Sequence, residues 1–314
     1  MSIVRLFRPR AVAAAVAATA AVTLTVAGCA TTPPASASGG DGTKITVVAA
    51  ENFWGSIASQ LGGDHASVTS IITNPDTDPH DYDATPADGR TMAGAQFVIV
   101  NGVGYDPWAP KLLASNANPN RTVLTVGQLV GVPDGGNPHR WYSPANVHQV
   151  IEQIAADYAK IDPADAAYFQ QRKEAFENQT LSQYNQLIST IRTKYAGTPI
   201  GASESIVSPL AECLGLDLIT PETFLDAISE GSDPTAADKA TIDTQIRTKQ
   251  IKVYVYNSQN STPDIQAQVD EAKAAGIPVT TVTETLAPAG ASFQDWQVKE
   301  LQGIQQALAK ATGK

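Results

Sequence analysis

Short apolar runs rich in β-branched residues alternate with longer amphipathic stretches along most of this 314-residue chain. Each run has the length of a strand, and alternation of this kind predicts parallel sheets flanked by helices. The runs form two series, one in each half of the chain: residues 45–49, 68–72, 97–101 and 122–126, then 199–203, 252–256 and 279–283. We therefore expect an α/β protein of two lobes, each a mostly parallel sheet flanked by helices.

The strongest helix signal lies between the two series, over residues 162–196. Asp162 is a suitable N-cap, Pro163 fits the first helical position, and Gly197 supplies a stop. No Gly or Pro interrupts residues 164–195. A helix of this length extends roughly 50 Å, so we expect it to join the lobes and to limit their relative movement.

The amino terminus predicts export and lipid attachment. Three arginines precede an apolar run over residues 11–26, which ends shortly before Cys29. The run has 16 residues, fewer than the roughly 20 that a membrane-spanning helix needs, so residues 1–28 fit a secretory signal better. The segment before Cys29 resembles a bacterial lipoprotein lipobox. The resemblance implies that Cys29 is lipidated and holds the protein on the outer face of the cell membrane.

Composition sets the remaining domain boundaries. Residues 29–43 are rich in Pro, Ser and Gly and lack an apolar period, so we interpret them as a flexible tether that begins with the lipidated cysteine. The rest of the chain is longer than one hydrophobic core usually spans. We expect an N-terminal lobe over residues 44–161, the linking helix over 162–196 and a C-terminal lobe over 197–314.

Charge narrows the possible partners. The chain carries 21 Lys and Arg against 31 Asp and Glu, a net charge of −10. This acidic balance argues against a nucleic-acid partner and is compatible with binding cations. We expect a monomer.

Two histidines and two glutamates follow predicted strands. His80 and His139 each come after a proline in a loop, and Glu204 and Glu284 directly follow the strands 199–203 and 279–283. Ligands of open α/β sheets bind beyond the carboxyl ends of the strands, so each lobe places two candidates at the correct edge. Imidazole nitrogens and carboxylate oxygens can together complete the coordination of a divalent transition metal.

Several stretches resemble the cluster 9 (A-1) substrate-binding lipoproteins of ABC transporters, which bind zinc and manganese. The similar stretches are PHDYDATPAD (79–88), AQFVIVNGVGYDPW (95–108), NPHRWYSPANV (137–147), ASESIVSPLAECLGL (202–216) and SDPTAAD (232–238). The resemblance implies a metal held between two lobes that one rigid helix joins, and delivery of that metal to a membrane permease.

The same resemblance implies the ligands. His80 and His139 match the two Pro-His positions, and Glu204 matches the third position, where zinc-type members often have His and manganese-type members Glu. Glu284 matches a fourth position that is usually Asp, with Asn257 as the alternative. Two imidazoles with two carboxylates are a harder ligand set than three imidazoles with one carboxylate. We therefore slightly favour Mn²⁺ over Zn²⁺, and Fe²⁺ also fits.

Two other functions use the same residues. A metallohydrolase would need an open metal position and a general base, but the sequence contains neither H-E-x-x-H nor G-x-S-x-G. An adhesin-type lipoprotein would keep the metal only to stabilise its fold. We expect a binding protein and not an enzyme.

Overall fold

A computed structural model describes residues 43–75, 77, 79–80 and 82–314. The predicted signal segment, Cys29 and the tether up to residue 42 lie outside the described residues. The described residues all belong to one compact unit, Gly42–Lys314.

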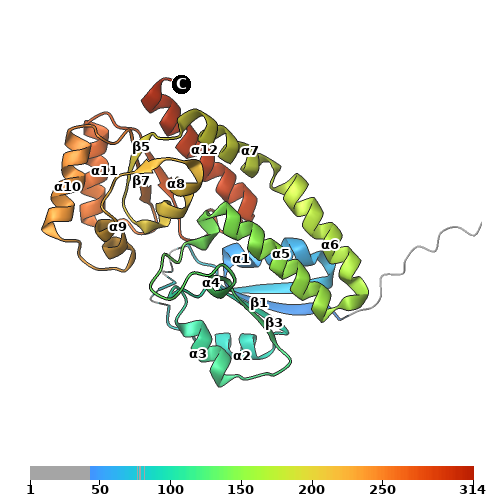
Figure 1. Ribbon diagram of the computed structural model, residues 1–314. Coiled ribbons are helices and arrows are strands. Elements are labelled where there is room, and N and C mark those ends of the chain that lie inside the picture. The colour runs from blue at the N-terminus through green and yellow to red at the C-terminus, as the bar shows by residue number, and fades with distance from the viewer. Residues whose placement is uncertain (1–42, 76, 78, 81) are drawn as a thin grey trace, which may run out of the picture. The chain divides into compact units, whose positions relative to one another are not determined.

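The N-terminal lobe is built on a parallel four-stranded sheet with the strand order β2-β1-β3-β4. Helices flank it on both faces (Figure 1). The strands are β1 (Ile45–Glu51), β2 (Ala66–Ile72), β3 (Phe97–Val100) and β4 (Thr122–Thr125). The helices are α1 (Asn52–Gly62), α2 (Pro86–Ala93), α3 (Trp108–Ser115), α4 (Val126–Leu129) and α5 (Pro144–Ile161), with the 3₁₀ turns η1 (Gly63–His65) and η2 (Arg140–Tyr142).

The C-terminal lobe repeats this topology with the strand order β6-β5-β7-β8, again all parallel. The strands are β5 (Pro199–Ala202), β6 (Asp217–Leu218), β7 (Val253–Asn257) and β8 (Val279–Val282). The helices are α8 (Ser208–Leu214), α9 (Glu222–Ser229), α10 (Ala236–Arg247), α11 (Pro263–Ala274) and α12 (Phe293–Thr312), with the 3₁₀ turn η5 (Ser205–Val207). In both lobes the strand order reverses beside the first strand, which is where open α/β sheets bind ligands.

The two-lobed α/β prediction is confirmed, and all seven predicted strands are present within two residues of their expected bounds. The sequence pattern missed β6, because two residues leave no alternation to detect. Among the described helices none combines the length and the hydropathy that crossing a bilayer requires.

The linking helix is present but is not one unbroken α-helix. It consists of the 3₁₀ turn η3 (Pro163–Asp165), α6 (Ala166–Ala175), the π-helical segment η4 (Phe176–Thr180) and α7 (Ser182–Tyr195). In the π segment the Leu181 N–H donates to the Phe176 carbonyl at 2.9 Å, five residues back. The extra residue rotates the buried face of the helix between its two halves. As a result α6 packs on α5 and α1 of one lobe, whereas α7 packs on α12 and α8 of the other (Figure 1).

A second helix also joins the lobes. The first turn of α12 lies against α1, where the Phe293 N–H donates to Ser56 Oγ at 2.9 Å and Gln294 exchanges a hydrogen bond with Gln60 at 3.0 Å. The main hydrophobic core is correspondingly continuous, since one cluster of buried residues includes side chains of both sheets. These contacts should restrict the movement of one lobe relative to the other.

A buried carboxyl group lies where α12 meets the end of β8. Glu300 Oε1 accepts hydrogen bonds from Thr283 Oγ1 at 2.9 Å and Trp296 Nε1 at 2.8 Å, and its Oε2 lies 2.5 Å from the Tyr142 hydroxyl. Burial raises the pKa of Glu300 to about 8 in spite of these hydrogen bonds. Because Tyr142 belongs to the N-terminal lobe, this network fixes the end of β8, in the C-terminal lobe, against the N-terminal lobe.

Glu300 should make the folding stability dependent on pH. The pKa is raised from 4.5 to about 8, so the unfolded chain releases this proton while the folded chain keeps it. The free energy of unfolding should therefore fall as pH rises from about 4.5 to about 8, by at most about 1.4 kcal/mol per pH unit. Glu300→Gln should flatten this slope in urea titrations between pH 5 and 8, whereas the exposed Glu174→Gln should not. An unchanged slope in Glu300→Gln would refute the assignment.

Candidate metal centre

All four predicted ligands lie where the two lobes face each other. His80 belongs to the loop after β2, and His139 directly precedes η2. Glu204 follows β5 after one residue, and Glu284 follows β8 after one residue. Each lobe thus supplies two of the four side chains from the carboxyl end of its sheet, as the sequence predicted.

Two of the predicted ligands, His139 and Glu284, face each other across the lobes. His139 is fully buried, and its Nε2 lies 3.5 Å from Glu284 Oε1. The Tyr105 hydroxyl donates to Glu284 Oε2 at 2.9 Å, and Asn257 Nδ2 donates to Oε1 at 3.0 Å. Asn257 Oδ1 accepts from the Gln259 N–H at 2.9 Å. Asn257, the alternative ligand, therefore supports Glu284 in this arrangement.

His80 lies beside the same group. Its ring centroid is 6.4 Å from that of His139 and 4.8 Å from that of Tyr105, which it meets edge to face. The Tyr105 ring also lies 6.0 Å from the His139 ring, so one aromatic side chain contacts both imidazoles and Glu284.

Glu204 is buried with one oxygen left without a hydrogen bond. Only 1% of the residue is exposed, and its Oε1 has no hydrogen-bond partner among the described residues. Its Oε2 accepts long hydrogen bonds, at 3.4 Å, from Ser229 Oγ and Asn260 Nδ2. Burying a carboxyl group in this way is unfavourable unless a proton or a cation compensates it.

The two carboxyl groups have opposite pKa shifts. Burial, and then the negative charge of Glu284, raise the pKa of Glu204 to about 8. Burial alone would also raise the pKa of Glu284, but the charge of the nearby His139 and the Tyr105 hydrogen bond outweigh it and hold this pKa below its ordinary value. Of the two carboxyl groups, Glu284 is thus the more readily ionised and Glu204 the more readily protonated. Two imidazoles and two carboxylates of this kind suit a divalent cation that displaces the proton.

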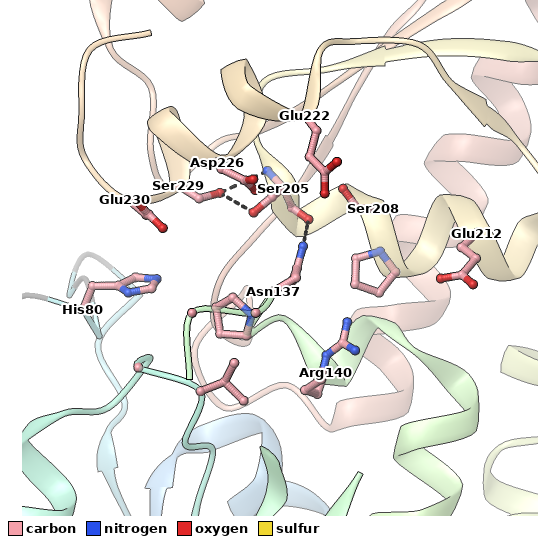
Figure 2. A pocket seen from close by; sticks show the side chains of 16 residues that line it. His80, Asn137, Arg140, Ser205, Ser208, Glu212, Glu222, Asp226, Ser229 and Glu230 are labelled. Carbon is pink, nitrogen blue, oxygen red and sulfur yellow. Dashed lines mark hydrogen bonds between the residues drawn. The ribbon is translucent and has the colours of Figure 1, made fainter. Parts of the chain in front are cut away.

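A cavity of about 500 Å³ lies between the lobes next to these residues. Figure 2 shows that its lining combines Arg140 with four acidic side chains, Glu212, Glu222, Asp226 and Glu230. A smaller cavity of about 70 Å³ is lined by Glu284. His80 and Ser229 line both cavities, so the acidic cavity adjoins the predicted site.

The acidic lining carries like charges close together. Burial raises the pKa of Asp226, and the neighbouring charges of Glu222 and Glu230 raise it further. Such an arrangement lowers the electrostatic energy of a cation that enters the cavity.

A second group of metal-ligating atoms lies where η1 of the N-terminal lobe meets the start of the linking helix. Among the described residues, the three side chains whose ligating atoms already lie within 4.8 Å of one another are His65, Asp162 and Asp165. His65 Nδ1 is 2.7 Å from Asp165 Oδ2, and both side chains are partly exposed. The remaining histidine, His148, lies 3.4 Å from Glu177 and is also partly exposed. His65 and His148 therefore lie outside the predicted site between the lobes.

The loop after β3 contains a site residue whose role the sequence left open. Gly102, Val103 and Gly104 all have positive φ angles of 59–80°, and Asp106 closes the loop by accepting from the N–H groups of Asn101 and Gly102, each at 2.8 Å. This conformation places the Tyr105 ring beside the imidazoles of His80 and His139. Tyr105 is fully buried and its hydroxyl donates to Glu284, so it belongs both to the core and to the site.

The chain is similar in sequence to proteins that are named for binding metals. The chain is 26% identical over 208 residues to the manganese-binding lipoprotein MntA of Halalkalibacterium halodurans, covering 63% of this chain and 66% of that protein. It is 32% identical over 139 residues to the iron-binding protein YfeA of Yersinia pestis, covering 42% of this chain and 44% of that protein. Both alignments therefore span less than two thirds of the relative's length.

Solved structures share the fold. A Mn-bound periplasmic metal-binding protein from Candidatus Liberibacter asiaticus superposes with a TM-score of 0.71 at 21% identity, covering 85% of this chain and all of that one. The family model described as zinc-uptake complex component A, periplasmic, matches residues 47–307, which is nearly all of the described chain. The chain therefore belongs to the family of periplasmic zinc-uptake components.

Proposed function

We propose that this protein is the substrate-binding component of an ABC importer, which captures a divalent transition metal between its lobes and delivers it to a membrane permease. His80, His139, Glu204 and Glu284 hold the ion. The observation that carries the proposal is the contact of His139 with Glu284 across the lobes, beside the buried Glu204 oxygen that lacks a hydrogen bond. A cation at this position satisfies charges that burial otherwise disfavours.

The family and the relatives support capture over catalysis. The family is described as part of an uptake complex, and the relatives are named for binding manganese or iron. A capture protein needs complete coordination of its ion and no chemistry on it. The metallohydrolase and adhesin alternatives gain no such support.

We further propose that Mn²⁺ is preferred and that Cys29 anchors the protein by a lipid on the extracytoplasmic face. Two carboxylates among the four ligands favour Mn²⁺ or Fe²⁺ over Zn²⁺ in ligand hardness, although Zn²⁺ stands higher in the general affinity order. The test compares Mn²⁺, Zn²⁺ and Fe²⁺ binding to the soluble chain that begins at residue 30. Growth of a deletion strain under metal restriction, rescued by one metal alone, identifies the cargo, and equal rescue by all three contradicts a preference.

The acidic cavity should accelerate capture. Removing two of its exposed charges with Glu222→Gln and Glu230→Gln should slow Mn²⁺ association by up to about tenfold at ~0.01 M ionic strength and leave dissociation unchanged. The difference should shrink at ~0.15 M, where the Debye length falls from about 30 Å to about 8 Å. Stopped-flow tryptophan fluorescence measures both rates.

A charge-matched double variant provides the control. Asp64 and Glu174 are exposed acidic residues on η1 and α6, outside the lining of the cavity. Asp64→Asn with Glu174→Gln removes the same two negative charges and should leave the association rate close to that of the parent. Equal slowing in both double variants would show that net charge, and not the cavity, governs capture.

A further inference from the structure

The Asn137 side chain lies between His139 and the C-terminal lobe. Its Oδ1 is 3.0 Å from both the backbone N and the ring Nδ1 of His139. Its Nδ2 donates to the Ser205 carbonyl at 2.7 Å, a contact between the lobes that Figure 2 shows as a dashed line. The Asn-Pro-His sequence favours the first contact, because an Asn side chain readily accepts from the N–H two residues ahead.

These contacts fix the orientation of the amide. The backbone N–H of His139 can only donate, so the amide atom that faces it is the oxygen. The Ser205 carbonyl can only accept, so the atom that faces it is the nitrogen. Both ends of the amide are therefore determined by independent partners.

The orientation of the amide determines the tautomer of His139. Because Oδ1 has no hydrogen to give, the 3.0 Å contact with Nδ1 requires that Nδ1 carries the hydrogen. When the ring is neutral, as a metal ligand must be, the hydrogen on Nδ1 leaves the lone pair on Nε2. That Nε2 is buried, has no hydrogen-bond partner among the described residues and lies 3.5 Å from Glu284 Oε1.

The loop that carries Asn137 is held from its other side as well. Asn101 Nδ2 donates to the Pro138 carbonyl at 2.9 Å, and Asn101 Oδ1 accepts from Trp54 Nε1 at 3.0 Å. The backbone between Asn137 and His139 is thus fixed by both lobes, which leaves the imidazole little freedom to turn away.

We propose that Asn137 is a positioning residue that holds His139 as the Nδ1–H tautomer with Nε2 directed at the cation. The proposal rests on the proposed function for its effect on metal binding, whereas the tautomer itself is a property of the metal-free protein. Removing such a partner of a ligating histidine typically costs 10- to 100-fold in metal affinity.

Two variants and one control test this role. Asn137→Ala removes the acceptor, so the metal-free protein should populate the Nε2–H tautomer of His139, and Mn²⁺ affinity should fall by about 10- to 100-fold. Asn137→Asp keeps an acceptor for Nδ1 and should restore the Nδ1–H tautomer and most of the affinity. Asn178→Ala, an exposed asparagine of η4, should change neither. Long-range ¹H–¹⁵N NMR of the metal-free protein reports the tautomer, and calorimetry reports the affinity.

Each outcome has a distinct meaning. Retention of the Nδ1–H tautomer in folded Asn137→Ala overturns the proposal, and so does failure of Asn137→Asp to restore it. If Asn137→Ala does not fold, the tautomer in Asn137→Asp still decides. Failure of the parent protein to bind Mn²⁺, with the expected tautomers present, would refute the proposed function and leave the role of Asn137 intact.

Discussion

Replacing His139 with alanine should weaken Mn²⁺ and Zn²⁺ binding by more than about 100-fold. This loss exceeds the roughly 10- to 100-fold that removing a residue hydrogen-bonded to a metal ligand typically costs. His139 is fully buried and faces Glu284 across the lobes, so its loss removes one of the two proposed nitrogen ligands. His80→Ala should have a similar effect, because its ring lies beside the same two residues. Calorimetric titration of the metal-free protein measures both affinities and the stoichiometry.

The two other histidines make this prediction specific. His148→Ala should bind like the parent, since that side chain is partly exposed and lies beside Glu177. His65→Ala tests the alternative cluster with Asp162 and Asp165. If His65→Ala abolishes binding and His139→Ala does not, the cation binds in the N-terminal lobe and the site between the lobes is wrong.

Replacing Phe53 with alanine should lower the free energy of unfolding by about 3–5 kcal/mol, the usual cost of removing a buried Phe side chain. Phe53 is fully buried where the lobes meet. Its ring stacks on Trp141 at 4.1 Å and lies 6.4 Å from Trp296 of α12 and 6.3 Å from Tyr105. Urea unfolding monitored by circular dichroism measures the loss.

The conservative variant separates volume from aromatic contact. Phe53→Leu retains much of the buried apolar volume and should lose considerably less stability than Phe53→Ala. Because the core is continuous between the lobes, both variants should unfold in a single transition. Two separate transitions, or a loss below about 1 kcal/mol in Phe53→Ala, would contradict a shared core.

The sequence predicted the architecture well because its signals are local. Each strand of four or more residues leaves an apolar run, and parallel sheets place the residues that follow their strands at one edge. Glu204 and Glu284 lie just beyond the strands that the pattern predicted, and His80 and His139 lie in the two Pro-His loops. Whether these four bind the metal stays a prediction.

The features that sequence reasoning missed depend on packing between distant residues. The π segment at 176–180 has no Gly or Pro to mark it, and it exists because α6 and α7 must bury their apolar faces against different lobes. Asn137 looks like an ordinary loop residue until Ser205, 68 positions away, contacts its amide. Tyr105 likewise reaches Glu284 only because the lobes meet there.

The most direct test of the site is a crystal of the Mn²⁺-bound protein, measured for anomalous scattering near the manganese edge. We predict one strong peak between the lobes, coordinated by His80, His139, Glu204 and Glu284. A principal peak at His65, Asp162 and Asp165, or a peak between the lobes that any of the four side chains fails to coordinate, would contradict the proposed site.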